Sequence, residues 1–147
     1  MNLNNKGYDL NETYFEHNLK SLKIPNIFIH GVGLDHSMWL PQKKFFQKEE
    51  IVFYDLLNHG KSKKGWAKIT FNDFSLQLKK LTEYLNIAKF NLIGFSIGAV
   101  IAQHFASQYY NKINKLIIIA SVYKRSQEQI LKVKKRYNMA LHGEDIS

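Results

Sequence analysis

The sequence predicts an α/β fold built on a mostly parallel sheet, and three observations predict it. Four short apolar runs, rich in β-branched residues, are typical of strands buried on both faces. Longer segments between them repeat apolar residues at the three-to-four spacing of a helix. Glycine-containing turns follow three of the runs. Strands that alternate with helices form βαβ units, and the strands of such units are parallel.

The first half of the chain is expected to supply an edge hairpin and two buried strands. Residues 3–17 have the pattern of two short strands joined by a turn. The runs at 26–30 and 51–54 are the first two buried strands. A short helix over 38–47 is expected to join them. Pro41 does not prevent it, because proline is tolerated in the first turn of a helix.

The second half is expected to complete the alternation. A helix begins at a cap, either Thr70 or Asn72, and continues to about Leu85. It is followed by a buried strand at 90–95, a helix at 96–109, a buried strand at 113–120 and a helix at 126–141.

Composition limits the class of protein more than it identifies one. The 147 residues suit one domain, and 45% hydrophobic residues are ample for a packed core. The formal charge of +9 comes almost entirely from lysines spread along the chain, so we expect no nucleic-acid partner. The absence of cysteine excludes a disulfide and a cysteine nucleophile. We expect no cofactor and no bound metal.

Location and assembly are only weakly constrained. The first ten residues are polar and lack the apolar core of a signal peptide, and no apolar stretch is long enough to span a membrane. We therefore expect a cytoplasmic protein with no membrane contact. The oligomeric state cannot be predicted from the sequence.

The strongest chemical signal is the run Gly94-Phe95-Ser96-Ile97-Gly98, between a predicted strand and a predicted helix. A sharp turn there would hold Ser96 in a strained conformation with its hydroxyl exposed. The free N–H groups and positive dipole of the helix N-terminus would lie beside it. An ordinary tight turn is the alternative, but the strand–helix context favours a nucleophilic serine.

A second signal, His30-Gly31-Val32-Gly33, follows the first buried strand. Acyl transfer needs two donors aimed at the developing oxyanion. The backbone N–H groups of Val32 and Ile97 are the predicted pair. His30 is expected to organise this loop by hydrogen bonding and not to act as a catalytic base.

A third run, Asp55-Leu56-Leu57-Asn58-His59-Gly60-Lys61-Ser62, follows the second strand. The chain therefore carries the loop at 30–33, the turn at 55–62 and the serine turn at 94–98 in that order, and with these three motifs it resembles the N-terminal part of an α/β-hydrolase over about residues 7–141. Asn58 stands where that superfamily usually has glycine, and asparagine tolerates the left-handed conformation. The resemblance implies that Asp55, His59 and Ser62 are structural.

The resemblance also implies a reaction class. In this superfamily the sharp strand–helix turn that holds the nucleophile is called the elbow. A serine there, as at Ser96, implies attack on an ester, thioester or lactone through an acyl-enzyme. The chain resembles 3-oxoadipate enol-lactonase-like and pimeloyl-carrier methyl-esterase-like hydrolases of small molecules. Gly31, Trp39 and Phe95 are candidates for binding the substrate, with helix packing the alternative for Trp39. Residues 1–120 would form the N-terminal part of the hydrolase core, and 121–147 the start of a cap or lid.

A nucleophilic serine needs a histidine base and an acid that orients the histidine, and this catalytic triad is incomplete in the sequence. After Ser96 the superfamily supplies an acid and then a histidine from turns after later strands, but only His104 and His142 follow here. His104 lies far along the predicted elbow helix, and His142 has no strand before it. We expect the fold to be truncated before its last strands and this chain alone to be inactive. A catalytically inactive binding or interaction module is the alternative.

Overall fold

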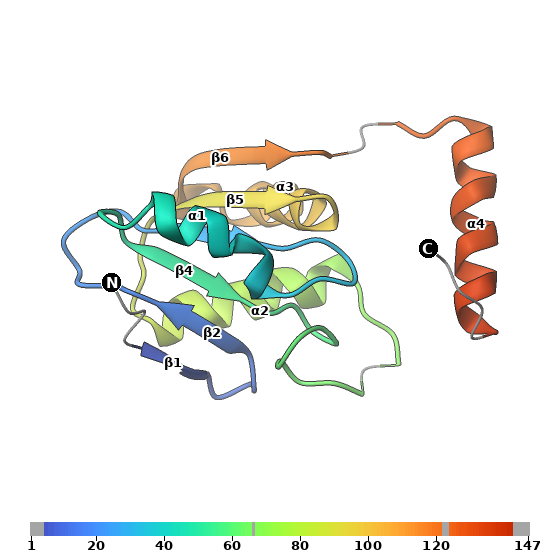
Figure 1. Cartoon of the computed structure of the whole chain (residues 1–147). Coiled ribbons are helices and arrows are strands. Elements are labelled where there is room, and N and C mark those ends of the chain that lie inside the picture. Colours follow the sequence, from blue (N-terminus) through green and yellow to red (C-terminus); the bar gives the residue numbers. More distant parts are fainter. Residues whose placement is uncertain (1–4, 66, 122–123, 143–147) are drawn as a thin grey trace.

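A six-stranded sheet in the order β1-β2-β4-β3-β5-β6 forms the frame of the molecule (Figure 1). The computed structural model describes residues 5–65, 67–121 and 124–142. The strands are β1 (Asn5–Tyr8), β2 (Tyr14–His17), β3 (Asn26–Ile29), β4 (Ile51–Tyr54), β5 (Phe90–Phe95) and β6 (Ile113–Ile119). The strands β4, β3, β5 and β6 are parallel to one another, whereas β1 and β2 form an antiparallel edge hairpin. The predicted α/β class and hairpin are confirmed.

The helices before α4 connect the parallel strands, and α4 follows the last of them. They are η1 (His36–Trp39), α1 (Leu40–Phe45), α2 (Phe71–Tyr84), α3 (Ile97–Tyr109), η2 (Tyr110–Lys112) and α4 (Gln127–Leu141). The helix expected over 38–47 is a 3-10 turn followed by a short α-helix, with Pro41 at the N-terminus of α1. Thr70, not Asn72, caps α2, and its hydroxyl and the Asp73 carboxylate form a capping box.

The core lies on both faces of the sheet because side chains alternate along each strand. Ile27 and Ile29 of β3 belong to the larger cluster, with residues of α2 and α3 such as Leu78 and Phe105. Phe28 belongs to a second cluster that includes Trp39 and Phe46 of the η1–α1 segment. The two clusters fix the carboxyl ends of the central strands, where the candidate site lies.

The strand β6 departs from one expectation. The run was predicted to be a buried strand, but Leu116, Ile117, Ile118 and Ile119 are each 38–39% exposed. The strand is present, and the prediction of burial was wrong. Among the described strands β6 pairs only with β5, so it is an edge of the sheet.

The last helix, α4, stands away from the sheet (Figure 1). Its first turn is closed by a reciprocal pair in which Ser126 and Gln129 each bond the other's backbone N–H. None of the helices in the described part of the chain is both long and apolar enough to cross a membrane.

We expect Leu78→Ala to destabilise the protein far more than Leu76→Ala, although both leucines lie on α2. Leu78 is fully buried, whereas Leu76 is 44% exposed. Removing the buried side chain leaves a cavity and lowers the free energy of unfolding by about 2–5 kcal/mol, against about 0.5 kcal/mol at the exposed position. Urea titration followed by circular dichroism measures both values, and equal losses would contradict the assigned core.

Candidate active site

The turn between β5 and α3 holds Ser96 in a conformation that few non-glycine residues adopt. Its backbone has φ +57° and ψ −117°, and its side chain is partly exposed. The Ser96 N–H donates to the Ile119 carbonyl at 3.0 Å, which ties the turn to β6. A strained residue costs of order 1–3 kcal/mol and persists only where its surroundings fix it.

Two glycines allow the strand and the helix to approach so closely. A Cβ atom on Gly98 would lie 2.5 Å from the carbonyl oxygens of both Ile29 and His30. A Cβ atom on Gly94 would overlap the Gly98 carbonyl oxygen. Backbone atoms cannot move aside as a flexible side chain can, so these positions admit only glycine.

The loop after β3 forms a tight turn beside Ser96. The Leu34 N–H donates to the Gly31 carbonyl at 3.3 Å, and Gly33 takes the positive φ of +71° that this turn requires. Val32 is 66% exposed, and its N–H has no backbone acceptor within the described residues. Ile97 is the first residue of α3, so its N–H has no partner within the helix.

These groups share one cavity. Val32, Ser96 and Ile97 all line a hollow of about 610 Å³. The structure therefore brings together the predicted nucleophile and both predicted oxyanion donors, from two turns more than sixty residues apart in the sequence. The arrangement can present two N–H dipoles to a negative charge that develops next to Ser96.

His30 has the organising position expected of it. The side chain is fully buried; its Nδ1–H donates to the Gly31 carbonyl at 2.8 Å, and its Nε2 accepts the Leu56 N–H at 3.0 Å. Burial is the main cause that lowers the pKa of His30, which favours the neutral ring that both bonds need. Both ring nitrogens are occupied, so His30 is not available as a base.

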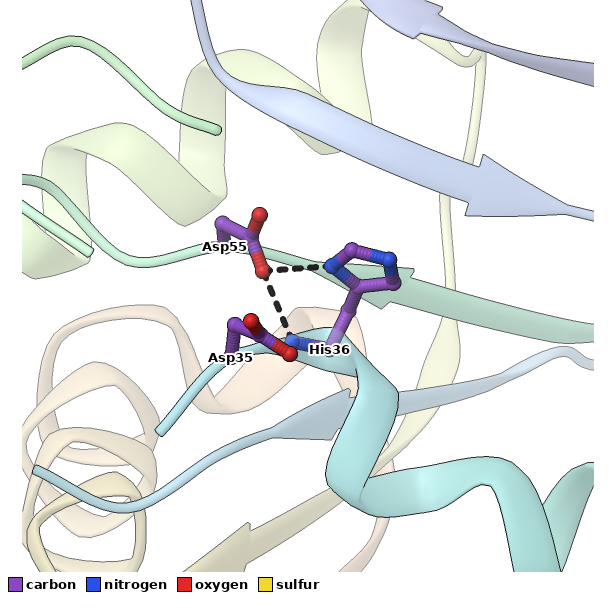
Figure 2. Close-up of side chains that lie close together, drawn as sticks. All are labelled: Asp35, His36 and Asp55. Carbon is purple, nitrogen blue, oxygen red and sulfur yellow. Dashed lines mark hydrogen bonds and ion pairs between the residues drawn. The ribbon is translucent and has the colours of Figure 1, made fainter. Parts of the chain in front are cut away.

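Asp55 joins the loop after β3 to the turn after β4 (Figure 2). Its Oδ1 accepts the His36 N–H at 2.7 Å and the His36 Nδ1–H at 2.8 Å, and its Oδ2 accepts the Lys61 N–H at 2.8 Å. The carboxylate is fully buried. Burial alone would raise the pKa of Asp55, but the hydrogen bonds from His36 and Lys61 outweigh it and hold the pKa below its usual value.

His36 lies between two carboxylates. Its Nε2 is 3.4 Å from the Glu16 Oε1, on the side of the ring opposite Asp55. The hydrogen bond to Asp55 is the main cause that raises the pKa of His36, and burial opposes it. The ring thus joins β2, η1 and the end of β4, and the raised pKa favours the protonated form that pairs with both carboxylates. The sequence analysis did not single out His36, because its partners are distant in the sequence.

One group of metal-ligating side chains is found in the described part of the chain. The ligand atoms of Asp35, His36 and Asp55 lie within 4.8 Å of one another (Figure 2). Hydrogen bonds already account for this group: Asp35 caps η1 by accepting a hydrogen bond from the Ser37 N–H, and both Asp55 oxygens accept hydrogen bonds from backbone N–H groups. A cation there would displace the His36 proton, so we treat the group as an ion-pair cluster.

The turn after β4 matches its expected structural role. Asn58 takes a φ of +62°, the left-handed conformation that asparagine tolerates. The Ser62 hydroxyl donates to the Asp55 carbonyl at 2.6 Å and accepts the Tyr14 N–H at 2.9 Å. His59 Nδ1–H donates to the Leu57 carbonyl at 2.8 Å. These bonds hold the turn against β2 and explain why the run is rich in polar residues.

The three predicted substrate-binding residues lie near the elbow but not in its cavity. Phe95 packs its ring over Gly31, with the ring carbon Cδ1 3.0 Å from the position of a Cβ on that glycine. Trp39 is buried with its ring centroid 5.1 Å from that of Phe28. Trp39 thus has the packing role that the sequence left as the alternative.

No histidine among the described residues is hydrogen-bonded to Ser96. His104 bonds the Ser75 hydroxyl at 2.9 Å and joins α3 to α2, a packing role in line with its predicted place on the helix. His142 bonds the Asn138 carbonyl at the end of α4. The described chain holds a nucleophile-like serine and two candidate donors without a base in contact.

Comparison with known proteins identifies the family. The model of the alpha/beta hydrolase fold family matches residues 27–139, which is more than half of the chain. The chain belongs to this family. The sheet order, the strand–helix elbow and the loop after β3 described above are therefore parts of an alpha/beta hydrolase.

Relatives of this alpha/beta hydrolase include enzymes of known reaction. It is 29% identical over 103 residues to an (E)-2-((N-methylformamido)methylene)succinate hydrolase of Acinetobacter baylyi, covering 69% of this chain and 39% of the relative. It is 26% identical to 3-oxoadipate enol-lactonase 2 of the same organism, with 70% and 39% covered. The crystal structure of MGS-M2, an alpha/beta hydrolase from a Medee basin deep-sea metagenome library, superposes with a TM-score of 0.82 at 27% identity, covering 89% of this chain and 49% of that one. The chain thus spans about two fifths to one half of these proteins.

The close approach at Gly98 gives a stability prediction. We expect Gly98→Ala to lower the free energy of unfolding by about 3 kcal/mol, because the added methyl group meets two backbone carbonyls that cannot give way. Gly7→Ala is the matched control, since nothing lies within 4 Å of a Cβ there. Its effect should stay within about 0.5 kcal/mol. Denaturant titration of both variants checks this, and an unchanged Gly98→Ala protein would contradict the described elbow.

The clamp at His36 gives a pH prediction. The folded-state pKa of His36 is raised, so its contribution to stability is full below the unfolded value of 6.5 and is lost as the pH rises through the folded value. We expect His36→Gln to cost about 1 kcal/mol more at pH 5.5 than at pH 9. Thermal denaturation across this range measures the difference.

The control for this pH effect is His142→Gln, which removes an exposed histidine bonded only to a backbone carbonyl. Its effect on the melting temperature should be small and nearly independent of pH. A His36→Gln cost that grows with rising pH would show that the ring is neutral in the folded protein.

Proposed function

We propose that this chain supplies the nucleophile and the oxyanion hole of a serine hydrolase that cleaves a carboxylic ester or a lactone. The observation that carries the proposal is Ser96 itself, held at φ +57° where β5 turns into α3 and lining a cavity of about 610 Å³. A strained serine at a helix N-terminus, with unbonded N–H groups nearby, suits attack on a carbonyl group.

In the proposed reaction, the Ser96 Oγ bonds to the carbonyl carbon while its proton passes to a general base. The carbonyl oxygen becomes negative and accepts hydrogen bonds from the Val32 and Ile97 N–H groups. The carbon–oxygen bond to the leaving group then breaks, and the leaving oxygen takes a proton. Water cleaves the acyl-Ser96 ester by the same steps and frees the acid. In a lactone the acyl group and the leaving oxygen belong to the same molecule, so hydrolysis gives a single hydroxy acid.

None of the described residues in contact with Ser96 could act as the base in this scheme. We propose that the acid and the histidine of the triad come from outside this chain, and that residues 121–147 begin the cap. The 147-residue chain alone is then expected to turn over esters negligibly. Turnover of a p-nitrophenyl ester that disappears in Ser96→Ala would show that the chain supplies its own base.

The relatives support this reaction class. One is named as an enol-lactonase and another as a hydrolase of a substituted succinate, so both act on small molecules. With the strained Ser96 of this chain, their names support a small ester, thioester or lactone as the substrate class we propose. One other function, a binding module that keeps the scaffold without catalysis, is favoured because no base among the residues the structure describes contacts Ser96.

The direct test is covalent labelling. We expect a fluorophosphonate in excess to add one phosphonyl group at Ser96 in a longer form of the protein that contains the triad acid and histidine, because the oxyanion donors stabilise the negative charge that develops on the phosphonyl oxygen. Intact-protein mass spectrometry measures the adduct, and peptide mapping locates it. The adduct should be absent in Ser96→Ala and unchanged in Ser107→Ala, which removes an exposed serine from the same helix.

Labelling that persists in Ser96→Ala, or that falls equally in both variants, would contradict the assignment of the nucleophile. A folded form that contains the triad acid and histidine, in which Ser96 stays unlabelled, would favour the binding module.

A further inference from the structure

The cavity beside Ser96 has an uneven chemical character. One part of its wall is apolar and includes Phe71, Val100 and Ile130. Lys124 and Arg125 complete the lining, from the segment that leads from β6 into α4. None of the described residues that line the cavity is an aspartate or a glutamate.

The two cations are free of acidic partners within the described part of the chain. Neither Lys124 nor Arg125 takes part in any of its ion pairs. The nearest acidic residue along the chain, Glu128, is paired with Lys132 at 2.7 Å. Lys124 and Arg125 are exposed, so each can turn toward a ligand.

The cavity also opens onto the N-terminus of α3, which adds a positive dipole to the two side-chain charges. A guanidinium binds a carboxylate through two parallel hydrogen bonds, and an ammonium adds a point charge. An apolar wall with a cationic border therefore suits a molecule that has a short hydrocarbon part and one anionic end.

We propose that the substrate of this site carries a carboxylate, separate from the bond that is cleaved, and that Arg125 binds it with help from Lys124. The proposal rests on the proposed function for the choice of an ester or lactone, but the anion site itself needs no catalysis. The carboxylate would hold the acyl chain along the apolar wall, with the carbonyl carbon at the Ser96 hydroxyl.

The test is a binding measurement on the whole 147-residue chain labelled with nitrogen-15. Three probes of similar length are titrated: monomethyl glutarate, methyl pentanoate, and methyl 4-phosphonobutanoate. Shifts of the Ile97 and Val100 amide signals give the dissociation constants. We expect monomethyl glutarate to bind about tenfold tighter than methyl pentanoate, the gain expected for a charge-assisted hydrogen bond.

Variants locate the anion site. Arg125→Gln should remove most of the tenfold preference, and Arg125→Lys should restore part of it. Lys89→Gln is the matched control, because this exposed lysine precedes β5 at the opposite end of that strand from Ser96. It removes the same charge and should leave the preference unchanged.

The outcomes separate this proposal from the proposed function. In Ser96→Ala the preference for the acid should persist, whether or not Ser96 reacts with a fluorophosphonate. Equal affinity for the acid and the neutral ester, no shift with the acid, or an equal loss in Lys89→Gln would overturn the anion site. Tighter binding of the phosphonate than of the carboxylate would overturn the assignment to a carboxylate.

Discussion

The close contact between α3 and β3 is the constraint on which the rest of the site depends. Gly98 places the first turn of the helix directly against the carbonyls of Ile29 and His30. Only with that contact does the chain turn sharply enough to hold Ser96 at a positive φ, next to the loop that begins at Gly31. Ile97 begins α3 at this contact and lines the cavity, so the positions of the nucleophile and of this proposed donor both depend on one packing contact.

A second layer of polar contacts keeps the loop after β3 in place. The buried carboxylate of Asp55 accepts hydrogen bonds from the backbone and ring of His36 and from the backbone of Lys61. His30 bonds the loop on its other side, through the Gly31 carbonyl and the Leu56 N–H. A buried charge is costly unless it is fully hydrogen-bonded, and here those hydrogen bonds set the position of the proposed oxyanion donor.

The local pattern of residue types was enough to predict the strands, the hairpin and the elbow, because a buried strand and a glycine-flanked turn are each encoded by residues close together in the sequence. It did not predict the clamp at His36, whose carboxylate partners come from β2 and from the end of β4. It misjudged β6 because an apolar run does not show whether a neighbouring strand covers it. Trp39 could not be assigned between pocket and core, since that choice depends on how η1 sits over Phe28.

The central claim is that Ser96 and two backbone donors form one reactive site. A crystal structure of the phosphonylated protein, in the longer form that contains the triad histidine, tests it most directly. The account predicts a phosphorus atom bonded to the Ser96 Oγ and a phosphonyl oxygen about 2.7–3.1 Å from the N–H nitrogens of both Val32 and Ile97. A phosphonyl oxygen that points to solvent, or that contacts neither nitrogen, would contradict it.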